Sequence, residues 1–322
     1  MIVDFHVHVV HPEVLRQTGN RNVVYGWGTK EVPPPDPEDV RTRQVARMLD
    51  PALQVEDMDR LGIDRFVLSA STVVQNTTWA EPAQQAELER LSNDLIAQWV
   101  ADRPDRFAGL ATLPLEDIRL ALAELERCAG LGLRGLNLPA AVAGDYLGAP
   151  RFHPLWEAIA DAGLVAFLHP DGSRDLWFQE YSLWNSVGQP VEEAKLLSSL
   201  ILEGVLERYP ALKIVVGHGG GYLPHYFGRL DRNVTNMPDS VRNISRRPSE
   251  YLHDLYYDTC VYDVSILEAI VDRYGADHVV LGSDYPVGET DPIGFVRRAR
   301  NIGTDDEPQV LGETAARLLG LS

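Results

Sequence analysis

The hydrophobic and polar residues of this chain follow two alternating patterns. Short runs rich in β-branched residues recur, and each is followed by a polar or Gly/Pro break and then by apolar residues at helical spacing. Eight runs are predicted to form strands: 2–8, 65–70, 107–113, 133–138, 165–169, 213–218, 255–259 and 279–284. Seven segments are predicted to form helices: 51–61, 84–102, 116–131, 154–162, 192–208, 264–274 and 310–319.

Nearly continuous apolar strands that alternate with amphipathic helices are typical of a parallel sheet. Eight such units predict an α/β fold, a (β/α)8 TIM-type barrel, in which residues 1–322 form a single domain. The alternative is an open, doubly wound sheet, which would normally show a glycine-rich phosphate loop after its first strand. Here the Pro-rich segment of about 9–50 follows that strand instead, and we expect it to be a long insertion.

The first predicted strand carries polar residues in one register. Side chains at i and i+2 of a strand point to the same side, about 7 Å apart. Asp4, His6 and His8 should therefore share one face, and Val3, Phe5, Val7 and Val9 the other. Two imidazoles placed in this way could be an incidental pair or could bind one metal ion, and the spacing alone does not decide between the two.

Three further polar residues fall at or beside the carboxyl ends of predicted strands. These are His169, His218 and Asp284. The active site of a (β/α)8 barrel lies at that end of the strands. Three imidazoles and one carboxylate suit a divalent ion, most simply Zn²⁺ and alternatively Mn²⁺, and His218 is then left as a neutral acid or base near it.

The lysines indicate one metal ion rather than two. Binuclear hydrolases on this scaffold often bridge their metals with a carboxylated lysine at a strand end. The chain has three lysines: Lys30 in a loop, Lys195 in a helix and Lys213 at the start of a strand. None is placed to bridge two ions, so a mononuclear site is expected.

The bulk composition narrows the kinds of partner. The formal net charge of −18 disfavours nucleic acids and anionic membranes. No apolar run approaches the roughly 18–20 residues of a membrane-spanning helix, and the first residues lack the pattern of a signal peptide. The only two cysteines lie far apart, as in proteins of a reducing compartment. We therefore expect a cytoplasmic protein.

Several sequence blocks together resemble the amidohydrolase superfamily, and within it the branch of decarboxylases. They are DFHVH (4–8), DPALQVEDMDRLGID (50–64), RPDRFAGLATLPL (103–115), FLHP (167–170), VVGHGGG (215–221), FGRLD (227–231), PSEY (248–251) and LGSDYP (281–286). The resemblance covers nearly the whole chain and implies the barrel of the metal-dependent hydrolase fold.

The resemblance also implies roles for individual residues. It implies metal ligation by His6, His8, His169 and Asp284, and acid/base catalysis by His218, in which Asp284 could share. Arg229 matches an arginine that binds a substrate carboxylate, in some members from the neighbouring subunit, so a homodimer is expected. A second arginine of the family corresponds to Arg41 or Arg43, although the spacing to Asp50 differs by one residue for either.

Aromatic residues lie in the predicted loops around this site and could pack against a substrate. They are Trp27, Trp79, Trp177, Phe178, Tyr181 and Trp184, and Asn185 follows the last of them. Ordinary loop packing is the competing interpretation for each.

The predicted activity is non-oxidative, metal-dependent decarboxylation of a small unsaturated or aromatic carboxylic acid. The same site could instead hydrolyse a lactone or amide, or hydrate an unsaturated acid, because a fold alone does not fix the reaction. A third possibility is a barrel kept as a binding protein, but the presence of all five polar site residues argues against it.

Overall fold

The computed structural model describes residues 1–19, 38–173, 175–237 and 241–321, and Trp27 and Lys30 lie outside these ranges. One eight-stranded sheet runs in the order β1-β2-β3-β4-β7-β8-β9-β10, with parallel neighbours. Its strands are β1 (Val3–Val9), β2 (Arg65–Ala70), β3 (Phe107–Ala111), β4 (Gly135–Leu138), β7 (Val165–Leu168), β8 (Lys213–Val216), β9 (Tyr256–Asp258) and β10 (Val279–Val280).

Hydrogen bonds from β1 to the segment after β10 close this sheet into a barrel. The Phe5 amide donates to the Leu281 carbonyl at 2.8 Å, and the amide of Tyr285 donates to the His6 carbonyl at 3.0 Å. The His8 amide donates back to the Tyr285 carbonyl at 2.9 Å. The predicted (β/α)8 barrel is therefore confirmed.

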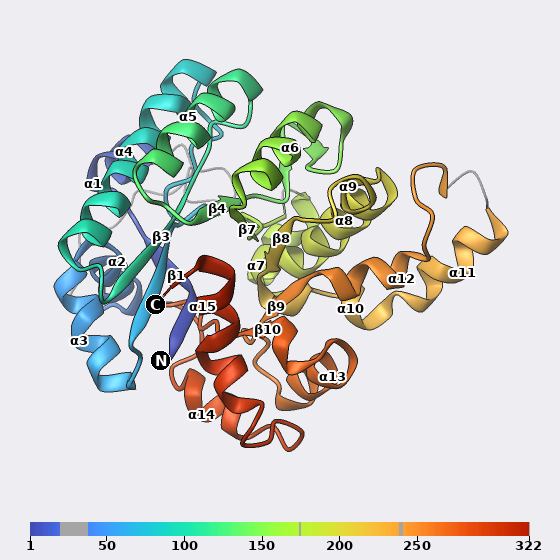
Figure 1. Ribbon diagram of the computed structural model, residues 1–322. Helices are drawn as coiled ribbons and strands as arrows, with labels where there is room; N and C mark the ends of the chain where they lie inside the picture. Colours follow the sequence, from blue (N-terminus) through green and yellow to red (C-terminus); the bar gives the residue numbers. More distant parts are fainter. Residues whose placement is uncertain (20–37, 174, 238–240, 322) are drawn as a thin grey trace.

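Helices surround the barrel (Figure 1). They are α1 (Pro12–Thr18), α2 (Val40–Leu49), α3 (Pro51–Leu61), α4 (Pro82–Asp102), α5 (Ile118–Gly130), α6 (His153–Ala162), α7 (Leu183–Ser186), α8 (Gly188–Leu202), α9 (Val205–Arg208), α10 (Leu223–Tyr226), α11 (Gly228–Asn236), α12 (Pro248–Tyr251), α13 (Val264–Tyr274), α14 (Pro292–Arg297) and α15 (Thr314–Leu319). A two-stranded hairpin, β5 (Ala141–Val142) and β6 (Asp145–Tyr146), lies apart from the barrel sheet. No helix of the described chain is long and apolar enough to cross a membrane.

Within the predicted insertion of 9–50, the described residues form α1 and α2, which begin at the N-caps His11 and Asp39. Two other predicted elements have wrong boundaries. The helix predicted at 192–208 breaks at Gly204, whose φ of 78° is left-handed. The last strand, predicted at 279–284, ends at Val280, and the described backbone after it hydrogen-bonds to the backbone of β1 only at Leu281 and Tyr285.

The strict alternation expected in β1 is also wrong. Val3 and Phe5 pack in the cluster formed by the strands and α15, whereas Val7 and Val9 pack in the outer cluster against the helices. The pairing of β1 with β2 shifts register between Asp4 and Val7, and this irregularity lets both halves of the strand present side chains inward. As a result, Phe5 fills the barrel below His6 and His8.

Candidate metal centre

Four predicted residues converge at the carboxyl end of the barrel. His6 and His8 lie on β1, His169 directly follows β7, and Asp284 lies after β10. One ligand atom from each lies within 4.8 Å of the others, and all four side chains are buried. Oδ1 of Asp284 is 2.9 Å from Nε2 of His8 and 3.4 Å from Nε2 of His6.

The other ring nitrogen of each histidine faces a polar side chain. Nδ1 of His6 donates to Oδ2 of Asp258 at 2.6 Å. Nδ1 of His8 lies 3.4 Å from Oγ of Ser69, and Nδ1 of His169 lies 3.4 Å from Oγ1 of Thr72. Such contacts orient an imidazole and leave Nε2 for a metal.

The three Nε2 atoms are the unpaired ones. Nε2 of His6, His8 and His169 is buried and has no hydrogen-bond partner. A buried polar atom without a partner is costly unless it binds something else. Three such nitrogens beside one carboxylate therefore fit a divalent metal ion, since imidazole and carboxylate are common ligands of zinc and manganese.

The protonation states of these side chains agree with metal binding. Burial lowers the pKa of His8 and of His169, so both imidazoles are neutral, the form that binds metal. Burial alone would raise the pKa of Asp284, but the neighbouring His6 and His8 hold it below its ordinary value. Its carboxylate is therefore ionised at neutral pH.

Asp4 supports this arrangement rather than joining it. Its carboxylate accepts hydrogen bonds from the amides of His6 and Ser283, both at 3.1 Å, and from the Ser283 hydroxyl. Burial raises the pKa of Asp4 to about 6. Because Ser283 precedes Asp284, Asp4 ties the segment that carries the carboxylate to the strand that carries the two histidines.

His218 lies beside the cluster, two residues beyond the end of β8 rather than at the strand end. Its ring centroid is 5.3 Å from that of His6 and 5.1 Å from that of His169. Its Nδ1 lies 2.6 Å from Oε1 of Glu193, a fully buried residue of α8. Burial alone would lower the pKa of His218, but the Glu193 carboxylate raises it to about 9. Its imidazole can therefore hold a proton at neutral pH.

Two site residues have unusual backbone angles. His218 has a φ of 50° and Asp284 a φ of 56°, in the left-handed region that residues with a Cβ rarely adopt. Such conformations persist only where the surroundings enforce them. Here the tight turns after β8 and β10 place each side chain at the mouth of the barrel.

The predicted substrate-binding arginines are exposed, unlike the four buried residues of the cluster. Arg229 is exposed on α11, which extends away from the barrel (Figure 1). Arg41 and Arg43 are exposed on α2, and Nη1 of Arg43 donates to the Glu38 carbonyl at 3.0 Å.

The predicted aromatic residues lie in different surroundings. Trp79 is half-buried and packs in a small cluster with α1 and α4. Trp177 and Tyr181 are exposed, and Phe178 is half-buried beside Trp177. Trp184 is half-buried on α7.

Asn185, the next residue of α7, connects indirectly to the centre. Its side chain donates to Gln189 at 2.8 Å, and Gln189 donates to the carbonyl of Pro170, which follows His169.

Two contributors were missed in the sequence, namely Asp258 behind His6 and Glu193 behind His218. Asp258 is the last residue of β9 and lies one residue before the end of the strand predicted at 255–259, and this position was the signal that could have drawn attention to it. Glu193 lies on a helix and carries no such signal. Its partner is visible only once α8 is packed against the turn that follows β8.

Comparison with known proteins identifies the family. Residues 3–321 match the family model described as amidohydrolase, and the chain belongs to this family. It is 33% identical over 278 residues to 2-amino-3-carboxymuconate-6-semialdehyde decarboxylase of Dictyostelium discoideum, covering 84% of this chain and 77% of that protein. The predicted superfamily and its decarboxylase branch are thereby confirmed, and the chain is an enzyme of that branch.

Solved structures support the same assignment. The crystal structure of 5-carboxyvanillate decarboxylase from Sphingomonas paucimobilis is 28% identical, with a TM-score of 0.89, covering 100% of this chain and 99% of that one. A dihydroxybenzoic acid decarboxylase from Polaromonas sp. JS666, solved with bound manganese and the inhibitor 2-nitroresorcinol, is 25% identical with a TM-score of 0.83, covering 99% and 97%.

Proposed function

We propose that this enzyme is a metal-dependent, non-oxidative decarboxylase of a small unsaturated or aromatic carboxylic acid. The observation that carries the proposal is the set of three buried, unpaired Nε2 atoms around Asp284 in a chain whose relatives are decarboxylases. The net reaction replaces the carboxylate by hydrogen: the carbon that bears it gains a proton, the C–C bond breaks, and CO2 leaves.

We infer that His6, His8, His169 and Asp284 hold one divalent ion. Three imidazoles favour zinc, while manganese, found in the Polaromonas relative, also accepts this set. When bound, such an ion acts as a Lewis acid and orients the oxygen atoms of the substrate. Among the lysines of the described chain, Lys195 pairs with Glu192 and Lys213 begins β8, so neither could bridge a second ion at this centre.

His218 is proposed to handle the proton. Glu193 fixes its Nδ1, so the opposite nitrogen, Nε2, is the atom that can exchange a proton with the substrate carbon. Asp284 could share this role. The buried carboxylate of Glu193 stabilises the protonated imidazole until the proton is transferred.

We further propose a homodimer in which Arg229 reaches the site of the partner subunit. Its guanidinium has the geometry to clamp a carboxylate, and α11 carries it away from the metal centre of its own chain. Arg43, Trp184 and Asn185 remain proposed contacts at the rim.

A panel of hydroxylated benzoates and muconate-type acids, assayed for CO2, tests the proposal. Release of one CO2 for each substrate consumed, dependent on metal and lost in His218→Ala, is the expected result. Hydrolysis or hydration by the same site would consume water and release no CO2. Metal-dependent turnover of a lactone, amide or unsaturated acid without CO2 would therefore replace decarboxylation by that alternative.

A further inference from the structure

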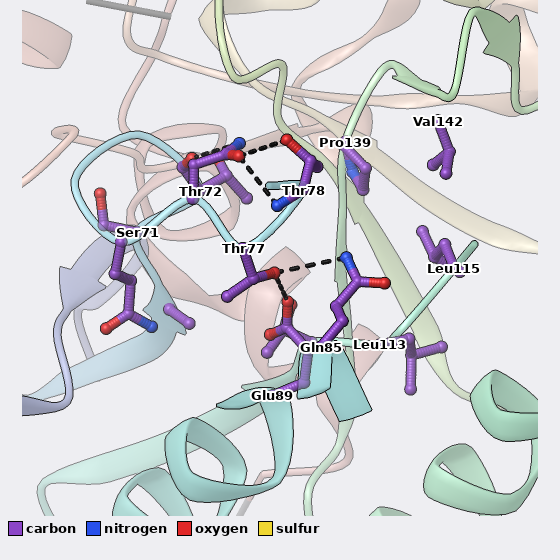
Figure 2. A pocket seen from close by; sticks show the side chains of 14 residues that line it. Ser71, Thr72, Thr77, Thr78, Gln85, Glu89, Leu113, Leu115, Pro139 and Val142 are labelled. Carbon is purple, nitrogen blue, oxygen red and sulfur yellow. Dashed lines mark hydrogen bonds between the residues drawn. The ribbon is translucent and has the colours of Figure 1, made fainter. Parts of the chain in front are cut away.

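A second feature of the catalytic face is a small recess beside the candidate metal centre. It is formed where β2, β3 and β4 end and is backed by α4. Thr72, in its wall, lies 3.4 Å from Nδ1 of His169, so the recess adjoins the metal centre. One side of the recess is polar and the other is apolar (Figure 2). The polar side is formed by Thr77, Gln85 and Glu89, and the apolar side by Leu113, Leu115, Pro139 and Val142.

The polar side contains a buried carboxyl group without a basic partner. Glu89 is 6% exposed, and its carboxylate accepts hydrogen bonds from Thr77 and Thr112. Neither lysine nor arginine lines the recess in the described chain. Burial raises the pKa of Glu89 to about 7. A buried acid in such surroundings is unfavourable for folding, so a purely structural role would be served better by glutamine.

Gln85 adds an unsatisfied acceptor to the same wall. Its side chain is buried, and its amide nitrogen faces Oγ1 of Thr77 at 3.4 Å. Its Oε1 has no hydrogen-bond partner. Leaving such a buried acceptor unpaired is unfavourable, and a ligand with an N–H or O–H group would satisfy it.

The size of the recess limits what can enter. The recess has a cavity volume of about 40 Å³, whereas one ordered water needs roughly 10–15 Å³ on the same measure. A substituent of a few heavy atoms therefore fits, but a whole aromatic acid does not. The apolar wall would contact the carbon atoms adjoining the substituent.

We infer that this recess is a specificity subsite for a hydroxyl or amino substituent of the substrate, read by Glu89 and Gln85. The inference rests on the proposed function for the placement of the carboxylate at the metal centre. With that end held by the metal, the substituent would enter the recess past Thr72 and donate to the two acceptors. Substrates without a donor at that position would leave the acceptors unpaired and bind more weakly.

The test is calorimetric binding of hydroxybenzoates, aminobenzoates and fluorobenzoates, matched in ring position, to the protein with the metal it carries as purified. We expect at least a tenfold preference for the donor-bearing probe at one ring position. Glu89→Met and Gln85→Met should each reduce this preference below threefold. Glu192→Gln, a control in another buried carboxylate of the same face, should retain it.

Absence of a preference in the wild type, or its survival in both variants, would overturn the inference. Gln85→Met alone decides the matter should Glu89→Met not fold. CO2 release is measured in parallel. A preference for donor-bearing probes without decarboxylation of any acid would support the subsite and refute the proposed reaction. Decarboxylation without such a preference would support the reaction and refute the subsite.

Discussion

At the scale of single residues, the site depends on carboxylates that hold the imidazoles. Asp258 fixes the proton of His6 on Nδ1 and so presents Nε2 to the metal. Loss of such a supporting contact typically reduces metal affinity by about 10–100-fold. We therefore predict a decrease of this size in Asp258→Asn, measured by competition with a chelator. Asp263→Asn, at the exposed cap of α13, should bind metal like the wild type, and equal affinity in both variants would contradict the role of Asp258.

Glu89 gives a prediction about pH. Its pKa is about 7 in the folded protein and 4.5 ordinarily, so the folded state binds the proton more tightly. The contribution of Glu89 to the free energy of unfolding is therefore fully present below pH 4.5. It is lost as the pH rises through 7, by up to about 3 kcal/mol. The Glu89→Gln variant lacks this dependence. Its free energy of unfolding, measured relative to that of the wild type, should therefore increase as the pH rises from 5 to 8.

Glu124 provides the control for this measurement. Burial would raise its pKa, but Arg127 and Asn93 hold it below the ordinary value. Its contribution to stability is therefore present above pH 4.5 and lost only in more acidic solution. Burial is the main cause of the raised pKa of Glu89 and the charge of Glu124 a smaller one, so Glu124→Gln should keep most of the wild-type pH dependence between pH 5 and 8. A constant difference between Glu89→Gln and the wild type over this range would show that the Glu89 carboxyl is not perturbed.

At the scale of elements, the close approach of α8 to the turn after β8 positions His218. Gly221 has a φ of 65°, and a Cβ there would lie 2.5 Å from the Pro190 carbonyl oxygen and 2.7 Å from Oε2 of Glu193. We predict that Gly221→Ala destabilises the protein by about 1–3 kcal/mol in denaturant unfolding and slows turnover.

Gly228→Ala is the matched control for this substitution. A Cβ at Gly228 meets nothing within 4 Å, and the residue begins α11, so stability should be equal or higher. Equal stability of both variants would show that the packing of α8 against the turn is looser than described.

The sequence predicted the bounds of helices well where one apolar face of the helix packs against the barrel. Helices α3 and α13 begin and end as the apolar spacing indicated, because each packs one face on the barrel. The register shift in β1 and the break at Gly204 were not predictable in this way. Both depend on which strand or helix lies opposite, and a periodic pattern does not contain that information. For the same reason Asp258 and Glu193 were missed.

At the scale of the whole molecule, Arg229 tests the dimer. Mixed subunits of Arg229→Ala and His218→Ala should regain activity if each site combines His218 of one chain with Arg229 of the other. Random pairing would restore roughly a quarter of wild-type activity, since half of the dimers would hold one intact site. Mixtures as inactive as the separate variants would place Arg229 outside the site of the neighbouring subunit.

The central claim is that four buried side chains form one metal centre. The most direct measurement is metal content by plasma mass spectrometry on the wild type and on His169→Ala, purified side by side. We predict about one equivalent of zinc or manganese in the wild type and its loss in the variant, since His169 supplies one of three imidazoles. Absence of metal from the wild type, even after reconstitution, would contradict the account.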